Sequence, residues 1–173
     1  APVDFSLTGK LGDIELEARG TLDGISANAQ ADVLLEARSA SLATLSVFTG
    51  RDLPDQGPLH ASLRLKGGEG NYRAKDIKLE LGAALLRATV DGAVDDLAGM
   101  RGIDLVVSAR TDRLAEIAKE FGLELPVEPP PFLDVEGRLQ GSLEALALAD
   151  YRVAVRDEGV QATIKGQVAN LIA

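Results

Sequence analysis

The amino-acid sequence predicts a mainly β protein: an elongated, curved antiparallel sheet built from internal repeats, with two short helices. Three observations lead to this fold class. Apolar and polar residues alternate along about ten segments, glycine-containing turn signals separate these segments, and the whole pattern recurs along the chain. Alternation with a period of two gives a strand one apolar and one polar face. Because short turns join most of the segments, we expect hairpins and therefore antiparallel pairing.

The strand segments follow one another along the chain. In residues 59–65 every second residue is apolar, and His, Ser and Arg stand between them. The same alternation occurs in residues 14–18, 31–37, 77–81, 86–90, 103–109, 133–135, 153–155 and 160–164. The steps Gly12-Asp13, Asp23-Gly24, Gly67-Gly68 and Asp91-Gly92 indicate turns or bulges between them.

Two segments carry apolar residues at a spacing of three instead of two, residues 39–48 and 111–121. This spacing predicts a short amphipathic helix in each. For the second helix, Thr111 or Asp112 is the expected N-cap and Gly122 the expected stop. A proline-containing segment follows each helix, at residues 53–58 and 125–130.

An internal repeat connects these elements. Residues 14–25 correspond to 86–97 and residues 31–54 to 103–126, at a register shift of 72. After a two-residue insertion the shift becomes 74, which relates 59–92 to 133–166. The sequence therefore predicts one repeat-built unit over residues 1–173, with a partial repeat at 1–58, a full repeat at 59–130 and a partial repeat at 131–173. We expect this unit to be excised from a longer chain.

The apolar phase changes at two equivalent places. Apolar residues have even numbers before Lys75-Asp76 and odd numbers after it, and the same change occurs across Ala149-Asp150. One extra residue in the strand keeps both halves of the pattern on one face of the sheet. We therefore predict a β-bulge at each place.

Composition and charge exclude several function classes. The formal net charge is −9, which argues against nucleic acid and against anionic lipid surfaces. The chain has no Cys and a single His, so Cys-ligated zinc and multi-histidine sites are excluded. His60 lies on the polar phase of its strand, where a surface role is expected. A hydrolase would need polar residues converging on the apolar face, but the alternation places them outside. We expect no catalytic residue, metal or cofactor, and hence no enzyme.

The apolar faces of about ten strands need a partner layer, and two short helices cannot cover them all. One solution is a sandwich or a curled sheet with a buried core, typical of a structural or adhesive scaffold. The other is an open groove for an apolar ligand, which the low aromatic content of 3% favours. We expect one concave face to carry Leu63, Leu65, Leu79, Leu81, Leu86, Val90, Leu105, Val107, Val135, Leu139, Val153, Val155, Val160 and Ile164.

The chain also resembles a known family. The resemblance lies in residues 41–45 leading into 53–59, in 63–68, in 72–82 and in 88–92. These segments combine Leu-polar alternation, an Asp before the second half of a strand, and a closing Gly. In these features the sequence resembles the AsmA-like family of bacterial envelope proteins, which is related to TamB and to bridge-like lipid transfer proteins.

The resemblance implies a taco-like half-pipe of β-strands in the periplasm, held by an inner-membrane anchor outside this fragment. It implies that the apolar inner face conducts phospholipid acyl chains toward the outer membrane. Further repeats of the same chain would then continue the sheet at both edges. Such a track requires no cofactor.

Overall fold

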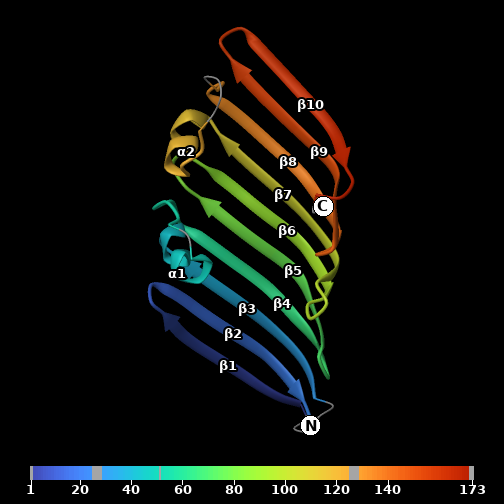
Figure 1. Cartoon of the computed structure of the whole chain (residues 1–173). Helices are drawn as coiled ribbons and strands as arrows, with labels where there is room; N and C mark the ends of the chain where they lie inside the picture. The colour runs from blue at the N-terminus through green and yellow to red at the C-terminus, as the bar shows by residue number, and fades with distance from the viewer. Residues whose placement is uncertain (1, 25–28, 51, 125–128, 172–173) are drawn as a thin grey trace.

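The chain forms a single ten-stranded antiparallel sheet in the computed structural model, which describes residues 2–24, 29–50, 52–124 and 129–171. The strands lie side by side in chain order, so β1 and β10 are at opposite ends of an open sheet (Figure 1). This confirms the predicted fold class. The strands are β1 (Pro2–Leu11), β2 (Ile14–Asp23), β3 (Gln30–Ser39), β4 (Leu59–Gly68), β5 (Asn71–Gly82), β6 (Arg87–Asp96), β7 (Arg101–Thr111), β8 (Phe132–Ser142), β9 (Ala145–Asp157) and β10 (Val160–Val168).

Strand β1 is not among the segments that alternation identified in the sequence. β1 pairs with β2 along its whole length, from Pro2 opposite Asp23 to Leu11 opposite Ile14. A turn at residues 12–13 joins the two strands, as the Gly12-Asp13 step predicts. The apolar residues Val3, Phe5, Leu7 and Leu11 give β1 the same phase as its neighbours, with glycine at position 9.

The helical segments lie along one side of the sheet (Figure 1). A 3₁₀ turn η1 (Leu42–Leu45) and helix α1 (Ser46–Thr49) follow β3, and helix α2 (Leu114–Glu120) follows β7. The prediction of Thr111 or Asp112 as N-cap of α2 was wrong. Arg113 occupies that position without a side-chain cap, because Thr111 is still the last residue of β7. Gly122 has φ +66° directly after the helix, so the predicted stop is correct.

The two helical connections begin with the same turn. Ser39 and Thr111, at equivalent positions of two copies, end β3 and β7 and are both buried. The backbone N–H of Ser41 donates to Ser39 Oγ at 3.2 Å, and that of Arg113 donates to Thr111 Oγ1 at 2.9 Å. A hydroxyl that satisfies the N–H two residues ahead directs the chain out of the strand. The two connections also touch, because Gln56 Nε2 donates to Glu120 Oε2 at 2.6 Å.

Both predicted bulges are present. Ala74 pairs with Val94 and Ile77 with Gly92, so Lys75 and Asp76 together oppose one residue of β6. Asp76 adopts φ +50° there. In β9, Leu148 pairs with Leu139 and Asp150 with Arg138, which leaves Ala149 as the extra residue. Because of the extra residue, the apolar residues after each bulge lie on the same face of the sheet as those before it.

Not every glycine step is a turn. Gly67-Gly68 lies inside β4, and the turn itself is at Glu69–Gly70; Asp91-Gly92 lies inside β6. Gly92 has φ +151°, and a Cβ built on it would be 2.0 Å from the carbonyl oxygen of Asp104. Gly20, its equivalent in the preceding copy, would place its Cβ 2.2 Å from the carbonyl oxygen of Asp32. At both places the absence of a side chain lets the neighbouring backbone approach closely on the apolar face.

Candidate functional site

Apolar residues form continuous rows across the strands on one face of the sheet, which we call the inner face. Directly paired residues of an antiparallel sheet project to the same side. The central row therefore follows from the register, and it crosses all ten strands through Gly9, Leu16, Ala37, Ala61, Leu79, Val90, Val107, Gly137, Tyr151 and Gly166. Its Tyr hydroxyl is the one polar side-chain group, so the row is almost entirely hydrocarbon.

The inner face is covered at its two sides and open between them. On the helix side, Leu42 and Leu45 of η1 pack against a buried cluster of Leu59, Leu81 and Ala83. On the opposite side, Leu97 and Leu146 pack against a second buried cluster of Ala74, Val94 and Ile103. Between these clusters most apolar side chains are half-buried, because no second layer lies over them within the described residues.

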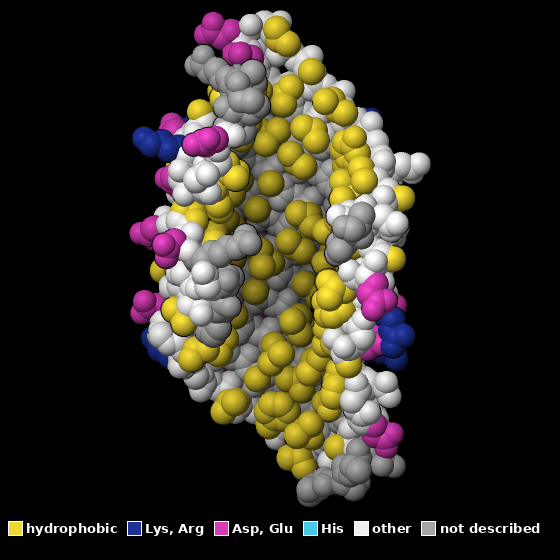
Figure 2. Space-filling view, in the orientation of Figure 1, with side chains coloured by type: hydrophobic (Ala, Val, Ile, Leu, Met, Phe, Trp, Pro, Cys, Tyr) yellow, Lys and Arg dark blue, Asp and Glu magenta, His cyan; other side chains and the backbone are white. Residues whose placement is uncertain are grey.

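The open part of the inner face is hollowed. Figure 2 shows hydrophobic side chains lining the hollow, with charged side chains gathered along its margins. An open cavity of about 730 Å³ lies over β1 to β5, with Leu7, Leu16, Leu35, Leu63 and Leu79 among its lining residues. Its inner-facing side chains are aliphatic, so a ligand here would be bound by apolar contact.

The structure brings the fourteen predicted inner-face residues together. Thirteen lie on strands β4 to β10 with a common phase, and direct pairs such as Leu79–Val90, Leu105–Leu139 and Val135–Val153 connect members of the set. Leu86 lies just before β6 instead of within it, and packs against the cluster of Leu59, Leu81 and Ala83. Val160 and Ile164 lie on the terminal strand β10 and are 63% and 59% exposed.

The predicted set omitted the first three strands, which supply much of the cavity. Leu7, Leu16, Ala18, Leu35 and Ala37 all line it. The signal for β2 and β3 was present in the alternation and in the internal repeat. For β1 the alternation itself was present, but Gly9 interrupts its apolar positions.

The opposite face, which we call the outer face, carries cross-strand ion pairs. Arg64 Nε donates to Asp32 Oδ1 at 2.6 Å and Arg64 Nη2 to Oδ2 at 2.9 Å, and Lys66 Nζ lies 3.0 Å from the same carboxylate. The hydrogen bond from Arg64 lowers the pKa of Asp32 from 3.8 to about 2. The hydrogen bond from Arg138 likewise holds the pKa of Asp104 below its ordinary value.

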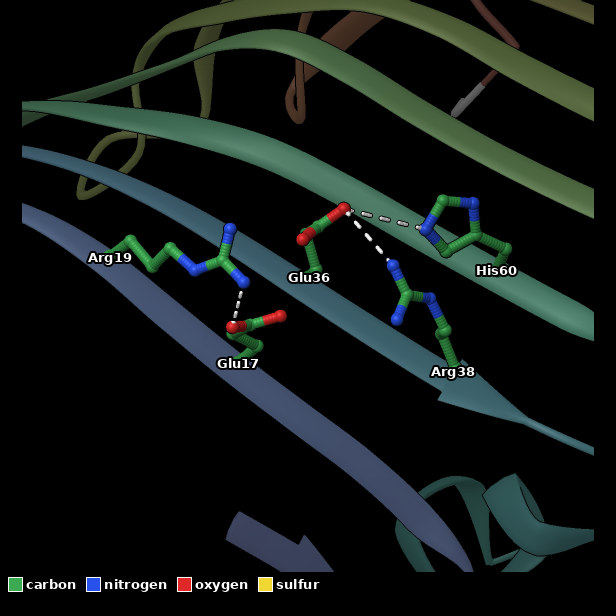
Figure 3. A network of polar contacts seen from close by, with 5 residues as sticks. All are labelled: Glu17, Arg19, Glu36, Arg38 and His60. Atoms are coloured by element: carbon green, nitrogen blue, oxygen red, sulfur yellow. Dashed lines mark hydrogen bonds and ion pairs between the residues drawn. The ribbon is translucent and has the colours of Figure 1, made fainter. Parts of the chain in front are cut away.

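His60 belongs to this outer face. Figure 3 shows its Nε2 directed toward Glu36, with the two atoms Nε2 and Oε1 separated by 3.8 Å, while Arg38 Nη2 lies 3.5 Å from the same Glu36 oxygen. Arg19 and Glu17, both on the neighbouring strand β2, form another ion pair (Figure 3). The only histidine thus lies beside the Glu36–Arg38 ion pair, on the other side of the sheet from the cavity.

Within the described residues, no cluster of three or more His, Asp or Glu side chains is arranged to hold a metal ion. The helices in this part of the chain are too short and too polar to cross a membrane. Comparison with protein-family models, with curated proteins and with solved structures finds no match to this chain.

Proposed function

We propose that the inner face is a groove that shields and conducts the acyl chains of phospholipids. The observation that carries this proposal is the central row of small and aliphatic residues, which crosses all ten strands and stays accessible between its two covered sides. An apolar track of this kind needs no catalytic group and no cofactor.

The energetics support a hydrocarbon ligand. Each CH₂ group kept from water contributes about 0.8 kcal/mol, so moving two acyl chains through water costs tens of kcal/mol. A continuous aliphatic surface lowers this cost at every position along the path. A specific polar site would instead hold one ligand in one place.

The dimensions also support it. Ten strands span nine spacings of about 4.8 Å, or about 43 Å along the groove. One leaflet of a bilayer has a hydrocarbon thickness of about 15 Å, half of the whole core. An extended acyl chain therefore covers about three strand spacings, and the groove offers several such lengths in succession.

The wider proposal follows the resemblance to the AsmA-like family. It places the chain in the periplasm of a bacterium, in a protein anchored in the inner membrane, with phospholipid passing between the inner and outer membranes. The unpaired edges of β1 and β10 are where further repeats would extend the sheet.

Neighbouring residues on opposite faces provide a matched test. Leu105 faces the groove and the exposed Val106 faces outward. Leu105→Asp should leave the fold in place and reduce crosslinking of a photoreactive phospholipid strongly, because an acyl chain that packs over the carboxylate removes its water. Val106→Asp should leave both properties unchanged. Equal crosslinking in the two variants would contradict the conduit.

A second measurement separates the groove from a structural scaffold. Phospholipid should co-purify with the protein and appear in mass spectra of its organic extract. If the inner face is instead a core that another protein layer covers, the protein should be free of lipid, and Leu105→Asp should abolish assembly with that layer without affecting any lipid.

A further inference from the structure

A second cavity lies at the helix-side end of the sheet, outside the groove. It has a volume of about 480 Å³ and is lined by the segment from Ala83 to Arg87, by Arg110 to Asp112, and by Phe132 and Arg156. Three arginine side chains from β6, β7 and β9 therefore border one cavity. Asp112 is the only acidic residue among its lining residues. Such a surplus of positive charge is unusual in a chain with a net charge of −9.

Among the described residues, no carboxylate oxygen lies within 4.0 Å of these three arginines, whereas most other arginines have such a partner. The described residues include eleven arginines, of which seven lie within 4.0 Å of a carboxylate oxygen: Arg19, Arg38, Arg64, Arg101, Arg113, Arg138 and Arg152. Of the remaining four, Arg87, Arg110 and Arg156 line the cavity, and Arg73 lies elsewhere on β5. Unpaired guanidinium groups are thus concentrated at one place.

The internal repeat shows what is specific to this place. Arg110 corresponds to Arg38 in the preceding copy, where Glu15 lies directly opposite on the neighbouring strand. At the equivalent of Glu15 the second copy has Arg87, which lies directly opposite Arg110. The equivalent of Glu36, whose carboxylate pairs with Arg38, is Ser108. These two acidic neighbours are therefore replaced, one of them by a second arginine. On the other side of Arg110, at the position equivalent to His60, the second copy has Asp134 of β8, whose carboxylate lies 3.7 Å from Arg152.

Phe132 holds two of the guanidinium groups in position. The Cζ atom of Arg110 lies 5.1 Å from the centre of its ring, and that of Arg156 lies 4.6 Å from it. Like charges opposite each other destabilise a sheet, whereas cation–π contacts fix their orientation. Arg110 and Arg156 are thus held over one ring, and Arg87 lies opposite Arg110, where the repulsion between like charges is a cost that a bound anion would offset.

We propose that Arg87, Arg110 and Arg156 form a binding site for a phosphate group. Guanidinium groups bind phosphate through paired N–H donors, and three of them can neutralise its charge. The segment from Ala83 to Leu86 borders this cavity and also contributes Ala83 and Leu86 to the apolar cluster at the side of the groove. The phosphate can therefore belong to a lipid headgroup or to a free ion, and the shared chemistry is the phosphate itself.

The test uses inorganic phosphate and a water-soluble short-chain phosphatidic acid, each titrated separately. The side-chain Nε–H signals of the arginines are followed by NMR. We expect both probes to shift the signals of Arg87, Arg110 and Arg156 in the wild-type protein. Arg110→Gln and Arg156→Gln should each weaken binding about tenfold or more, because each removes a charge-assisted hydrogen bond. Arg73→Gln is the matched control and should leave binding unchanged.

Arg87→Glu places a carboxylate opposite Arg110 on β6, as Glu15 lies opposite Arg38 in the preceding copy. It should abolish phosphate binding and raise the Tm measured without phosphate, because an opposite-charge pair then replaces two arginines that face each other. A site that has only a structural role would not respond to the probes.

The remaining outcomes assign the source or overturn the site. Much tighter binding of the short-chain lipid than of inorganic phosphate assigns a lipid headgroup, and equal binding assigns a free phosphate. The site is wrong if millimolar phosphate leaves the three signals unmoved, or if Arg73→Gln weakens binding as much as Arg110→Gln. Because inorganic phosphate does not enter an apolar groove, this result is independent of the proposed lipid conduit.

Discussion

The guanidinium group of Arg138 binds both carboxylate oxygens of Asp104, with Nε donating to Oδ1 and Nη2 to Oδ2, each at 2.7 Å. Arg64 and Asp32 form the same two-point contact at the equivalent positions of the preceding copy. Each pair joins β3 to β4 or β7 to β8 diagonally across the outer face. The repeat thus extends to the polar contacts that fix the register of the sheet, and it is not limited to the apolar pattern.

The first prediction concerns the pH dependence of the Asp32–Arg64 pair. Because the folded-state pKa of Asp32 is lowered from 3.8 to about 2, its contribution to stability is present above pH 4 and is lost as the pH falls toward 2. Asp32→Asn should lower the Tm by about 2 °C at pH 6, as expected for a largely exposed pair. Thermal unfolding of the wild type and of Asp32→Asn between pH 2 and pH 6 measures this difference in Tm. The difference should vanish near pH 2, and a difference that persists there would show that it does not come from the ionised carboxylate of Asp32.

The second prediction concerns the close approach of strands at Gly92. A Cβ at this position would lie 2.0 Å from the carbonyl oxygen of Asp104, and φ is +151°. Gly92→Ala should therefore lower the free energy of unfolding by about 1–3 kcal/mol. Gly9→Ala is the control, because Gly9 also lies in a strand on the inner face but a Cβ there meets nothing within 4 Å. Urea unfolding should show the two variants to differ, and equal stability would show that β6 and β7 can separate at this point.

The third prediction concerns the bulge in β5. Asp76 has φ +50°, a conformation that β-branched residues rarely adopt. Asp76→Val should reduce the free energy of unfolding by about 1–2 kcal/mol, whereas Asp76→Gly should keep it within about 0.5 kcal/mol of wild type. Chemical denaturation of the two variants tests this. If Asp76→Val and Asp76→Gly have equal free energies of unfolding, β5 does not depend on the left-handed conformation at this bulge for its stability.

The fourth prediction concerns Leu79, in the central row and on the wall of the cavity. Because its side chain is half-buried and water reaches the groove, Leu79→Asp should retain β-sheet circular dichroism and cooperative melting. The same variant should lose crosslinking of a photoreactive lipid beyond β5 and fail to restore outer-membrane integrity in cells lacking the protein. Full restoration would contradict lipid passage, and complete unfolding would indicate a closed core at this position.

The alternation of apolar residues was sufficient to predict which residues of β2 to β10 share one face of the sheet, but β1 was not among the segments found in this way. Leu105 and Val106 illustrate why, since adjacent residues of a strand project to opposite faces whatever the strand pairs with. The bulge at Asp76 was equally predictable, because a change of phase within one strand must be absorbed by an extra residue. The N-cap of α2 was not, because the end of a strand and the start of a helix compete for the same residues, and tertiary pairing kept Thr111 in β7.

The sequence by itself determined the antiparallel strands, the two faces and the bulges, which depend on residues close together in the chain. It also determined the repeat, which is found by comparing segments 72–74 residues apart. Tertiary structure alone decided that the inner face stays open over β1 to β5, that Arg138 on β8 reaches Asp104 on β7, and that Arg87, Arg110 and Arg156 border one cavity. These features depend on strand register and on where the helical connections pack. Both are set by contacts between distant segments, which periodicity within one segment does not encode.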